Sequence, residues 1–88
     1  MTTPAVVVYT KYNCFGCDKT KAVLDREHAE YTAVNVEDDA AAFLYVTETL
    51  NFRQMPVVVV SAPEGDEVWS GLQPQMIKKH ITHREIAA

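Results

Sequence analysis

Two uninterrupted apolar runs stand out along the chain, and both are rich in β-branched side chains. They cover residues 5–10 and residues 57–60, and such runs are typical of strands that are covered on both faces of a sheet. Residues 31–36 alternate in part between apolar and polar side chains, which predicts another strand. Residues 62–65 place Pro and Gly as a type I turn does, so residues 67–70 are expected to return antiparallel to the preceding strand.

Helical patterns fill the segments between these strands. Residues 17–28 favour helix and are anchored by Val23 and Leu24. The acidic residues 37–39 predict the start of a second helix, because carboxylates cap a helix N-terminus and offset its positive dipole end. The apolar residues of this helix recur at helical spacing to about residue 51 and predict one buried stripe. They are Ala40, Phe43, Leu44 and Leu50.

The last helix is predicted from Pro74, because proline suits the first turn of a helix. Its apolar side carries Met76, Ile77 and Ile81, with His80 beside them. The resulting order is β-α-β-α-β-β-α, in which the first strand–helix–strand unit makes its two strands parallel. The sequence thus predicts a single α/β domain over residues 1–88, a four-stranded mixed sheet with helices on both faces.

Composition and charge narrow the possible functions. The chain has 88 residues, of which 48% are hydrophobic and 23% charged, and this is the composition of one ordinary globular domain. No apolar run approaches the ~18 residues of a membrane helix, and the first residues lack the basic segment of a secretory signal. The formal net charge of −4 argues against electrostatic binding to nucleic acid or to anionic lipid. We expect a cytoplasmic monomer that acts on proteins or small molecules.

Cys14 and Cys17 are the two cysteines of the chain and form one Cys-x-x-Cys pair. A bridge between them closes a very short loop and removes little entropy from the unfolded chain, so it would be a poor structural staple. The pair falls where the first strand ends and the first helix begins, and the free N–H groups of a helix N-terminus stabilise a thiolate. Cys14 is therefore expected to be a solvent-facing nucleophile, and Cys17 a deeper thiol that resolves a mixed disulfide.

Zinc binding is the alternative use of two neighbouring cysteines. It would need two further ligands, and the candidates are His28, His80 and His83. Their spacing from the cysteines lies far outside the range that is usual for a zinc site. The apolar side of the last predicted helix also favours a packed histidine at position 80 over a ligand. The pattern favours redox use of the cysteines and predicts no metal site.

Several aromatic residues near the cysteines have both a structural and a functional interpretation. Phe15 offers apolar contact to a substrate. Gly16, which follows it, lowers helix stability in the first turn. Tyr12 is expected to face the site, and Tyr9 to lie in the core. Trp69 either packs in the core or offers an exposed contact to a partner, and its solvent exposure decides between the two.

Three segments of the chain carry a family resemblance. They are Val-Val-Val-Tyr-Thr-Lys-Tyr-Asn-Cys-Phe-Gly-Cys (residues 6–17), Phe-Arg-Gln-Met-Pro-Val-Val (residues 52–58) and Trp-Ser-Gly-Leu-Gln-Pro-Gln-Met-Ile (residues 69–77). In this order they resemble the NrdH redoxins, which are small glutaredoxin-like proteins with thioredoxin-like activity. The second and third segments make the resemblance more specific than Cys-x-x-Cys alone.

The resemblance implies a thioredoxin fold and a dithiol–disulfide oxidoreductase with no cofactor besides the redox-active disulfide Cys14–Cys17. It implies electron delivery to class Ib ribonucleotide reductase or another disulfide protein, and re-reduction from NADPH by thioredoxin reductase. It also implies a cis peptide bond between Met55 and Pro56 beside the sulfurs, where the Met55 backbone can bind an incoming peptide strand. The other candidate contact residues for a substrate or partner are Lys11, Tyr12, Phe15, Trp69, Ser70 and Gly71.

The sequence departs from the family pattern at two places. Members usually carry Phe-Arg-Pro-Asp after Trp-Ser-Gly, and this chain has Leu72, Gln73, Pro74 and Gln75 there. The missing Arg and Asp predict a more mobile loop and bear on docking to the ribonucleotide reductase. Between the cysteines, this chain has Phe-Gly where the family more often has an aliphatic residue and Gln.

Two other functions stay open at this point. A glutathione-dependent glutaredoxin would hold glutathione with a Gly-Gly pair and a following Asp, whereas here Ser70 and Gly71 are followed by no acid until Glu85. Lys11 is nevertheless placed to bind a glutathione carboxylate. A non-enzymatic [2Fe–2S] carrier would need four ligands, of which one chain supplies at most its two cysteines.

Overall fold

The sheet of the computed structural model, which describes residues 5–63 and 65–82, has the mixed directions that the sequence predicts. Its strands are β1 (Ala5–Thr10), β2 (Thr32–Asn35), β3 (Val57–Ala62) and β4 (Gly65–Ser70). Their order across the sheet is β2-β1-β3-β4. β1 pairs parallel with β2 and antiparallel with β3, and β4 pairs antiparallel with β3. The turn predicted at residues 62–65 includes Glu64, which lies outside the described residues.

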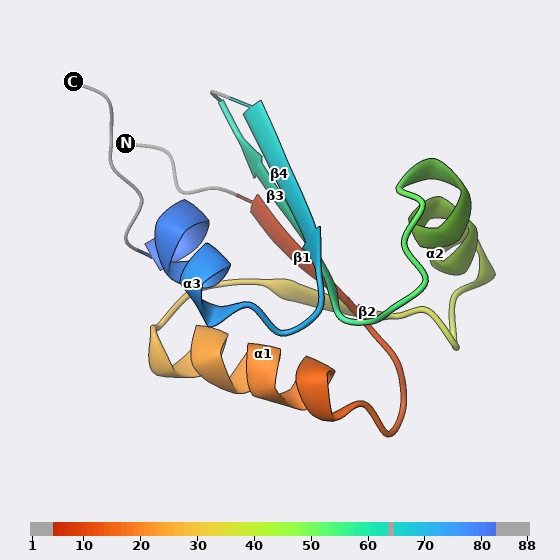
Figure 1. Cartoon of the computed structure of the whole chain (residues 1–88), viewed down its shortest axis with the longest axis horizontal. Helices are drawn as coiled ribbons and strands as arrows, with labels where there is room; N and C mark the ends of the chain where they lie inside the picture. The colour runs from red at the N-terminus through yellow and green to blue at the C-terminus, as the bar shows by residue number, and fades with distance from the viewer. Residues whose placement is uncertain (1–4, 64, 83–88) are drawn as a thin grey trace.

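The helices cover both faces of this sheet, as Figure 1 shows. α1 (Phe15–Arg26) and α3 (Pro74–Ile77) lie on one face, and α2 (Ala40–Leu44) lies on the other. α2 continues into a π-helical turn, η1 (Tyr45–Thr49), and α3 into a second one, η2 (Lys78–Thr82). None of the helices in the described part of the chain has the length and apolarity needed to cross a membrane.

Because strand side chains alternate between the two faces, they build two separate cores. One core lies under α1 and α3, where Leu24 and Ile77 are fully buried. Its other buried members are Val6, Val8, Val23, Val58, Val60 and Trp69. The second core lies under α2 and η1 and contains both Cys14 and Cys17. Its other buried members are Val36, Ala42, Val46, Met55, Val57 and Val59.

For the helix that became α2 and η1, the sequence predicts a buried stripe of four residues, and this prediction is wrong for three of them. These three, which are exposed, are Ala40, Phe43 and Leu44. The side chains that face the sheet are instead Ala42 and Val46, and the partly buried Leu50 continues their four-residue spacing. Both sets of residues fit a helical period, so periodicity alone could not choose between them. Packing against the sheet selects the set with the smaller side chains and leaves large apolar groups outside.

Candidate active site

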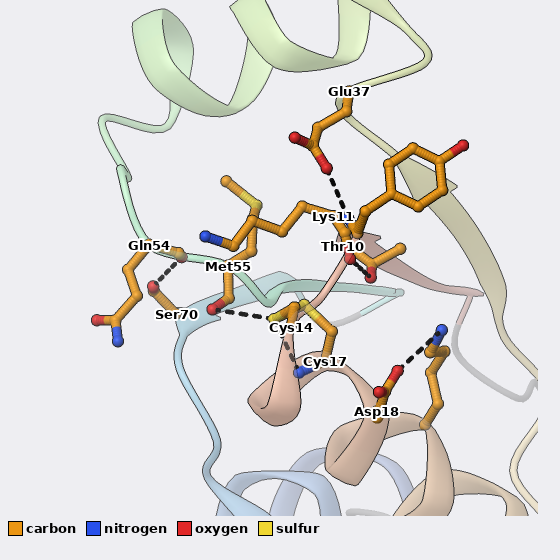
Figure 2. Close-up of a disulfide and its surroundings, with 11 residues drawn as sticks. Thr10, Lys11, Cys14, Cys17, Asp18, Glu37, Gln54, Met55 and Ser70 are labelled. Carbon is orange, nitrogen blue, oxygen red and sulfur yellow. Dashed lines mark hydrogen bonds and ion pairs between the residues drawn. A yellow bond between two sulfur atoms is a disulfide. The ribbon is translucent and has the colours of Figure 1, made fainter.

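Cys14 and Cys17 form a disulfide at the N-terminus of α1 (Figure 2). Cys14 is the N-cap of this helix, and its Sγ accepts a hydrogen bond from the Cys17 backbone N–H at 3.1 Å. α1 begins at Phe15, two residues before the predicted start, because a cysteine takes the cap position that Ser, Thr, Asp or Asn usually fill. The same N–H group is placed to stabilise a Cys14 thiolate after reduction.

The two cysteines differ in their access to solvent. Cys17 is fully buried, and Cys14 keeps 7% of its surface exposed. The prediction that Cys17 is the deeper residue is confirmed, whereas the prediction that Cys14 faces solvent openly is wrong for the disulfide form. Part of the cover is the Met55 carbonyl oxygen, which lies 3.8 Å from Cys14 Sγ. A disulfide sulfur has no hydrogen to donate, so this is a packing contact, and a hydrogen bond along it needs the reduced thiol.

The segment that faces the disulfide is Met55–Pro56, and its peptide bond is cis, as the family resemblance implies. Met55 is 8% exposed, and Pro56 is fully buried. The segment therefore presents backbone groups beside the sulfurs while its side chains are largely packed. Pairing of an incoming extended peptide with the Met55 backbone, which the family resemblance implies, stays a prediction.

Hydrogen bonds from the end of β4 hold this segment in place. Ser70 Oγ donates to the Gln54 carbonyl oxygen at 2.6 Å, and the Gly71 N–H donates to the Pro56 carbonyl oxygen at 2.8 Å. Gln73 Nε2 in turn donates to the Ser70 carbonyl oxygen at 2.8 Å. Gln73 thus provides a hydrogen bond inside the loop where the family carries Arg, and the greater mobility of this loop stays a prediction. Ser70 and Gly71 act here on the chain's own backbone.

The loop between β1 and α1 is held by the acidic residues that precede α2. The Tyr12 backbone N–H donates to Glu37 Oε1 at 2.6 Å, and the Tyr12 hydroxyl donates to Asp38 Oδ2 at 2.5 Å. The hydrogen bond to Asp38 raises the pKa of Tyr12, because ionising the phenol would lose the bond and bring two negative charges together. The sequence predicts that both acids cap the following helix and does not predict this role. The available signal was the parallel pairing of β1 and β2, which brings the loops after them to one edge of the sheet.

Three of the predicted contact residues lie exposed around the site. Tyr12 is 56% exposed and Phe15 72%, and Lys11 is also exposed. Figure 2 shows the Lys11 side chain extending from its loop toward the side where Met55 lies. The Lys19 ammonium lies 5.4 Å from the centre of the Phe15 ring, at the distance of a cation–π contact. The rim of the site is therefore aromatic and carries positive charge.

Trp69 is only 4% exposed, so the expectation that it offers an exposed contact to a partner is wrong. Its core-packing interpretation is confirmed, because it belongs to the core under α1 and α3. The ring lies beside His80, with 5.9 Å between the ring centres. His80 Nε2 also lies 3.6 Å from Glu67 Oε1. His80 of η2 is thus packed against β4, as its position on an apolar helix side predicts.

Of the three histidines considered as zinc ligands, the two within the described residues lie apart from the cysteines. His28 follows the end of α1, whereas the cysteines lie at its start, and a helix of 12 residues is about 18 Å long. His80 contacts Trp69 in the core under α1 and α3, which does not include the cysteines, and His83 lies outside the described residues. Within residues 5–63 and 65–82, no three His, Cys, Asp or Glu side chains cluster as metal ligands would.

The chemistry available at this site is thiol–disulfide exchange, and the surrounding sheet and helices are those of the thioredoxin fold. A family model described as Glutaredoxin matches residues 6–62. The structure of the glutaredoxin-like NrdH-redoxin from Escherichia coli superposes with a TM-score of 0.74 and 32% identity, over 85% of this chain and 92% of that one.

Similar sequences point the same way. The glutaredoxin-like protein NrdH of Salmonella typhimurium is 38% identical over 77 residues, which are 85% of this chain and 86% of that protein. The gene 56 protein of Mycobacterium phage L5 is 39% identical over 78 residues, 89% of this chain and 73% of that protein. The chain belongs to the glutaredoxin family and, within it, to the NrdH redoxins. It is a thiol–disulfide oxidoreductase, as the sequence predicts.

Proposed function

We propose that this protein carries electrons to class Ib ribonucleotide reductase in the cytoplasm and is re-reduced by thioredoxin reductase. The observation that carries the proposal is the similarity to NrdH proteins, which extends over 85% of the chain, and the Glutaredoxin family model covers the cysteine pair. A dithiol that must return to its reduced form after each cycle also suits a reducing compartment.

The reaction needs only the two sulfurs and the groups around them. In the reduced protein, the Cys14 thiolate attacks one sulfur of the substrate disulfide and releases the other as a thiolate. The Cys17 thiolate then attacks Cys14 Sγ, forms the intramolecular disulfide and releases the substrate. Two electrons and two protons pass to the substrate in total. The Cys17 N–H, 3.1 Å from Cys14 Sγ in the disulfide form, would stabilise the attacking thiolate.

The residues around the site support thioredoxin reductase as the electron source over glutathione. Glutathione is an anionic tripeptide, and Lys11 is the exposed cation that the sequence predicts for its carboxylate. Ser70 and Gly71 are followed by Leu72 and Gln73, so the Asp that would follow a Gly-Gly pair and bind the glutathione amine is missing there. One lysine is a weak substitute for a complete set of charged hydrogen-bonding groups.

Two NADPH-coupled assays on one disulfide substrate test the electron source. One assay supplies thioredoxin reductase, and the other supplies glutathione with glutathione reductase. We expect faster turnover in the first, and faster turnover in the second would overturn the assignment. Repeating the better assay with purified class Ib ribonucleotide reductase as the substrate tests the proposed acceptor, and failure to support deoxyribonucleotide formation would refute it.

Serine variants of the two cysteines test the dithiol mechanism. Cys14→Ser is expected to abolish disulfide reduction, because it removes the nucleophile. Cys17→Ser is expected to trap a mixed disulfide between Cys14 and the substrate, which intact-mass spectrometry detects. Normal turnover by Cys17→Ser would mean that the second sulfur is not needed, and the mechanism would be wrong.

A further inference from the structure

All of the net charge of the chain comes from the segment that contains α2 and η1. Residues 31–52 hold four acidic side chains and no lysine, arginine or histidine, so they account for the whole formal net charge of −4. All of these carboxylates are exposed. They are Glu37, Asp38, Asp39 and Glu48.

Large apolar side chains stand among these carboxylates. Phe43, Leu44 and Tyr45 are exposed by 49%, 56% and 38%. Asp39 lies four residues before Phe43, and Glu48 four residues after Leu44, which is the spacing at which helical side chains are neighbours. We call Asp39, Phe43, Leu44, Tyr45 and Glu48 together the α2 face. Large apolar side chains exposed among charged ones on one helix are typical of a surface that binds another protein.

The α2 face adjoins the disulfide site. Tyr12 donates hydrogen bonds to Glu37 and Asp38, and these bonds tie the start of α2 to the loop that leads into Cys14. In Figure 2, Glu37 lies between the α2 ribbon and this loop. α2 also packs over the core that contains both cysteines. The α2 face thus belongs to a helix whose start is joined by hydrogen bonds to the loop beside the disulfide.

We propose that the α2 face docks the protein partners of the disulfide and selects those that carry arginine or lysine side chains around an apolar groove. The apolar side chains would supply affinity, and the carboxylates would speed encounter with a basic partner and disfavour acidic ones. This inference rests on the thiol–disulfide exchange of the proposed function, but not on the identity of the reductase or of the final acceptor.

The same charges argue against other occupants of the α2 face. A second copy of the chain would bring carboxylates against carboxylates, which costs free energy when they face each other closely. An anionic membrane or a nucleic acid would be repelled for the same reason. A protein partner with a basic rim gains from both the charges and the apolar side chains.

Two synthetic peptides test the proposal. Both contain the same single disulfide loop and the same Leu-Phe segment, and they differ only in carrying arginines or glutamates at the same flanking positions. The pre-reduced protein is mixed with an excess of each peptide, and the second-order rate constant is measured from the loss of protein thiols. We expect the basic peptide to react about tenfold faster at an ionic strength of about 0.02 M. At about 0.5 M, screening should remove most of this preference.

Matched variants show whether the preference comes from the α2 face. Glu48→Gln is expected to reduce the preference for the basic peptide about threefold, and Phe43→Ala to slow the reaction with both peptides by a similar factor. Glu30→Gln removes an exposed carboxylate outside this face and should change neither rate. Bis(2-hydroxyethyl) disulfide is small and neutral, so its reduction should be equal in all variants and reports that the site is intact.

The outcomes separate this inference from the proposed function. Equal rates with the two peptides, or an equal effect of Glu30→Gln and Glu48→Gln, would overturn the docking proposal while leaving disulfide reduction in place. Failure to reduce the peptides and the small disulfide alike would contradict the thiol–disulfide chemistry itself.

Discussion

Gly16 lies directly against Pro56. A Cβ atom at position 16 would come within 3.2 Å of Pro56 Cδ and 3.9 Å of Leu72 Cβ. Because Gly16 lies between Cys14 and Cys17, this contact holds the disulfide close to the cis-proline segment. From the sequence, the glycine is only a cost to helix stability in the first turn. The structure supplies its reason, since a glycine permits a closer approach of α1 to Pro56 than any larger residue.

Gly16→Ala tests this contact. At an open helical position the change would stabilise the protein by about 1 kcal/mol. Here Pro56 is fully buried, so crowding should outweigh that gain, and we expect the free energy of unfolding in urea to fall by about 1 kcal/mol. Ala22→Gly, at an exposed position of the same helix, is the control and should cost about 0.5–1 kcal/mol. A Gly16→Ala protein more stable than the parent would show that the close approach is not maintained in solution.

Ser70→Ala removes the hydroxyl that donates to the Gln54 carbonyl oxygen at 2.6 Å. Without this bond, the segment that carries Met55 is less fixed beside the disulfide, and a peptide that pairs with its backbone should bind more weakly. We expect KM for a peptide disulfide to rise several-fold with kcat nearly unchanged, and stability to fall by about 1 kcal/mol. Ser70→Thr keeps the hydroxyl and should restore KM. Equal KM values in the Ala and Thr variants would assign Ser70 a packing role alone.

Three tyrosines make the protein sensitive to alkaline pH. Burial is the largest cause that raises the pKa of Tyr9 and Tyr31, and the hydrogen bond to Asp38 is the largest for Tyr12. The folded protein therefore holds these protons more tightly than the unfolded chain. The resulting stability is fully present below pH of about 10 and is lost as the pH rises through the raised values.

Asp38→Asn isolates the contribution of Tyr12. The substitution removes the carboxylate that accepts from the phenol, so the pKa of Tyr12 should move down toward its ordinary value. Titration of tyrosinate absorbance in the folded protein measures this shift. Asp66→Asn, an exposed acid on β4, is the matched control and should leave the titration unchanged. Identical curves for the parent and Asp38→Asn would indicate that the Tyr12–Asp38 bond does not persist in solution.

The strands could be predicted from the sequence because their signal is local. The β-branched run at residues 5–10 coincides with β1, and the valines at 57–60 begin β3. The parallel pairing of β1 and β2 follows from a rule of chain connection that needs no tertiary detail. The orientation of α2 could not be predicted in the same way, because two sets of residues fit its period and only contact with the sheet distinguishes them.

In the site, too, some features could be predicted from the sequence and others could not. Cys14 and Cys17 stand at a strand–helix junction, and that position alone indicates their chemistry. The place of Met55 opposite them depends on contacts across the fold, which no local pattern encodes, and only the family resemblance implies it. Helix α1 starts earlier than predicted because a sulfur caps it, and thiols are not among the usual capping groups.

Leu24→Ala and Leu44→Ala make the same chemical change on opposite sides of the fold, and together they test the corrected orientation of α2. Leu24 is fully buried under the sheet, so its truncation should cost about 2–5 kcal/mol in the free energy of unfolding. Leu44 is 56% exposed, and its truncation should change that free energy by less than about 0.5 kcal/mol. Urea denaturation with a constant m-value measures both. A large cost at Leu44 would mean that the stripe predicted from periodicity is the buried one, and it would also remove the apolar part of the α2 face.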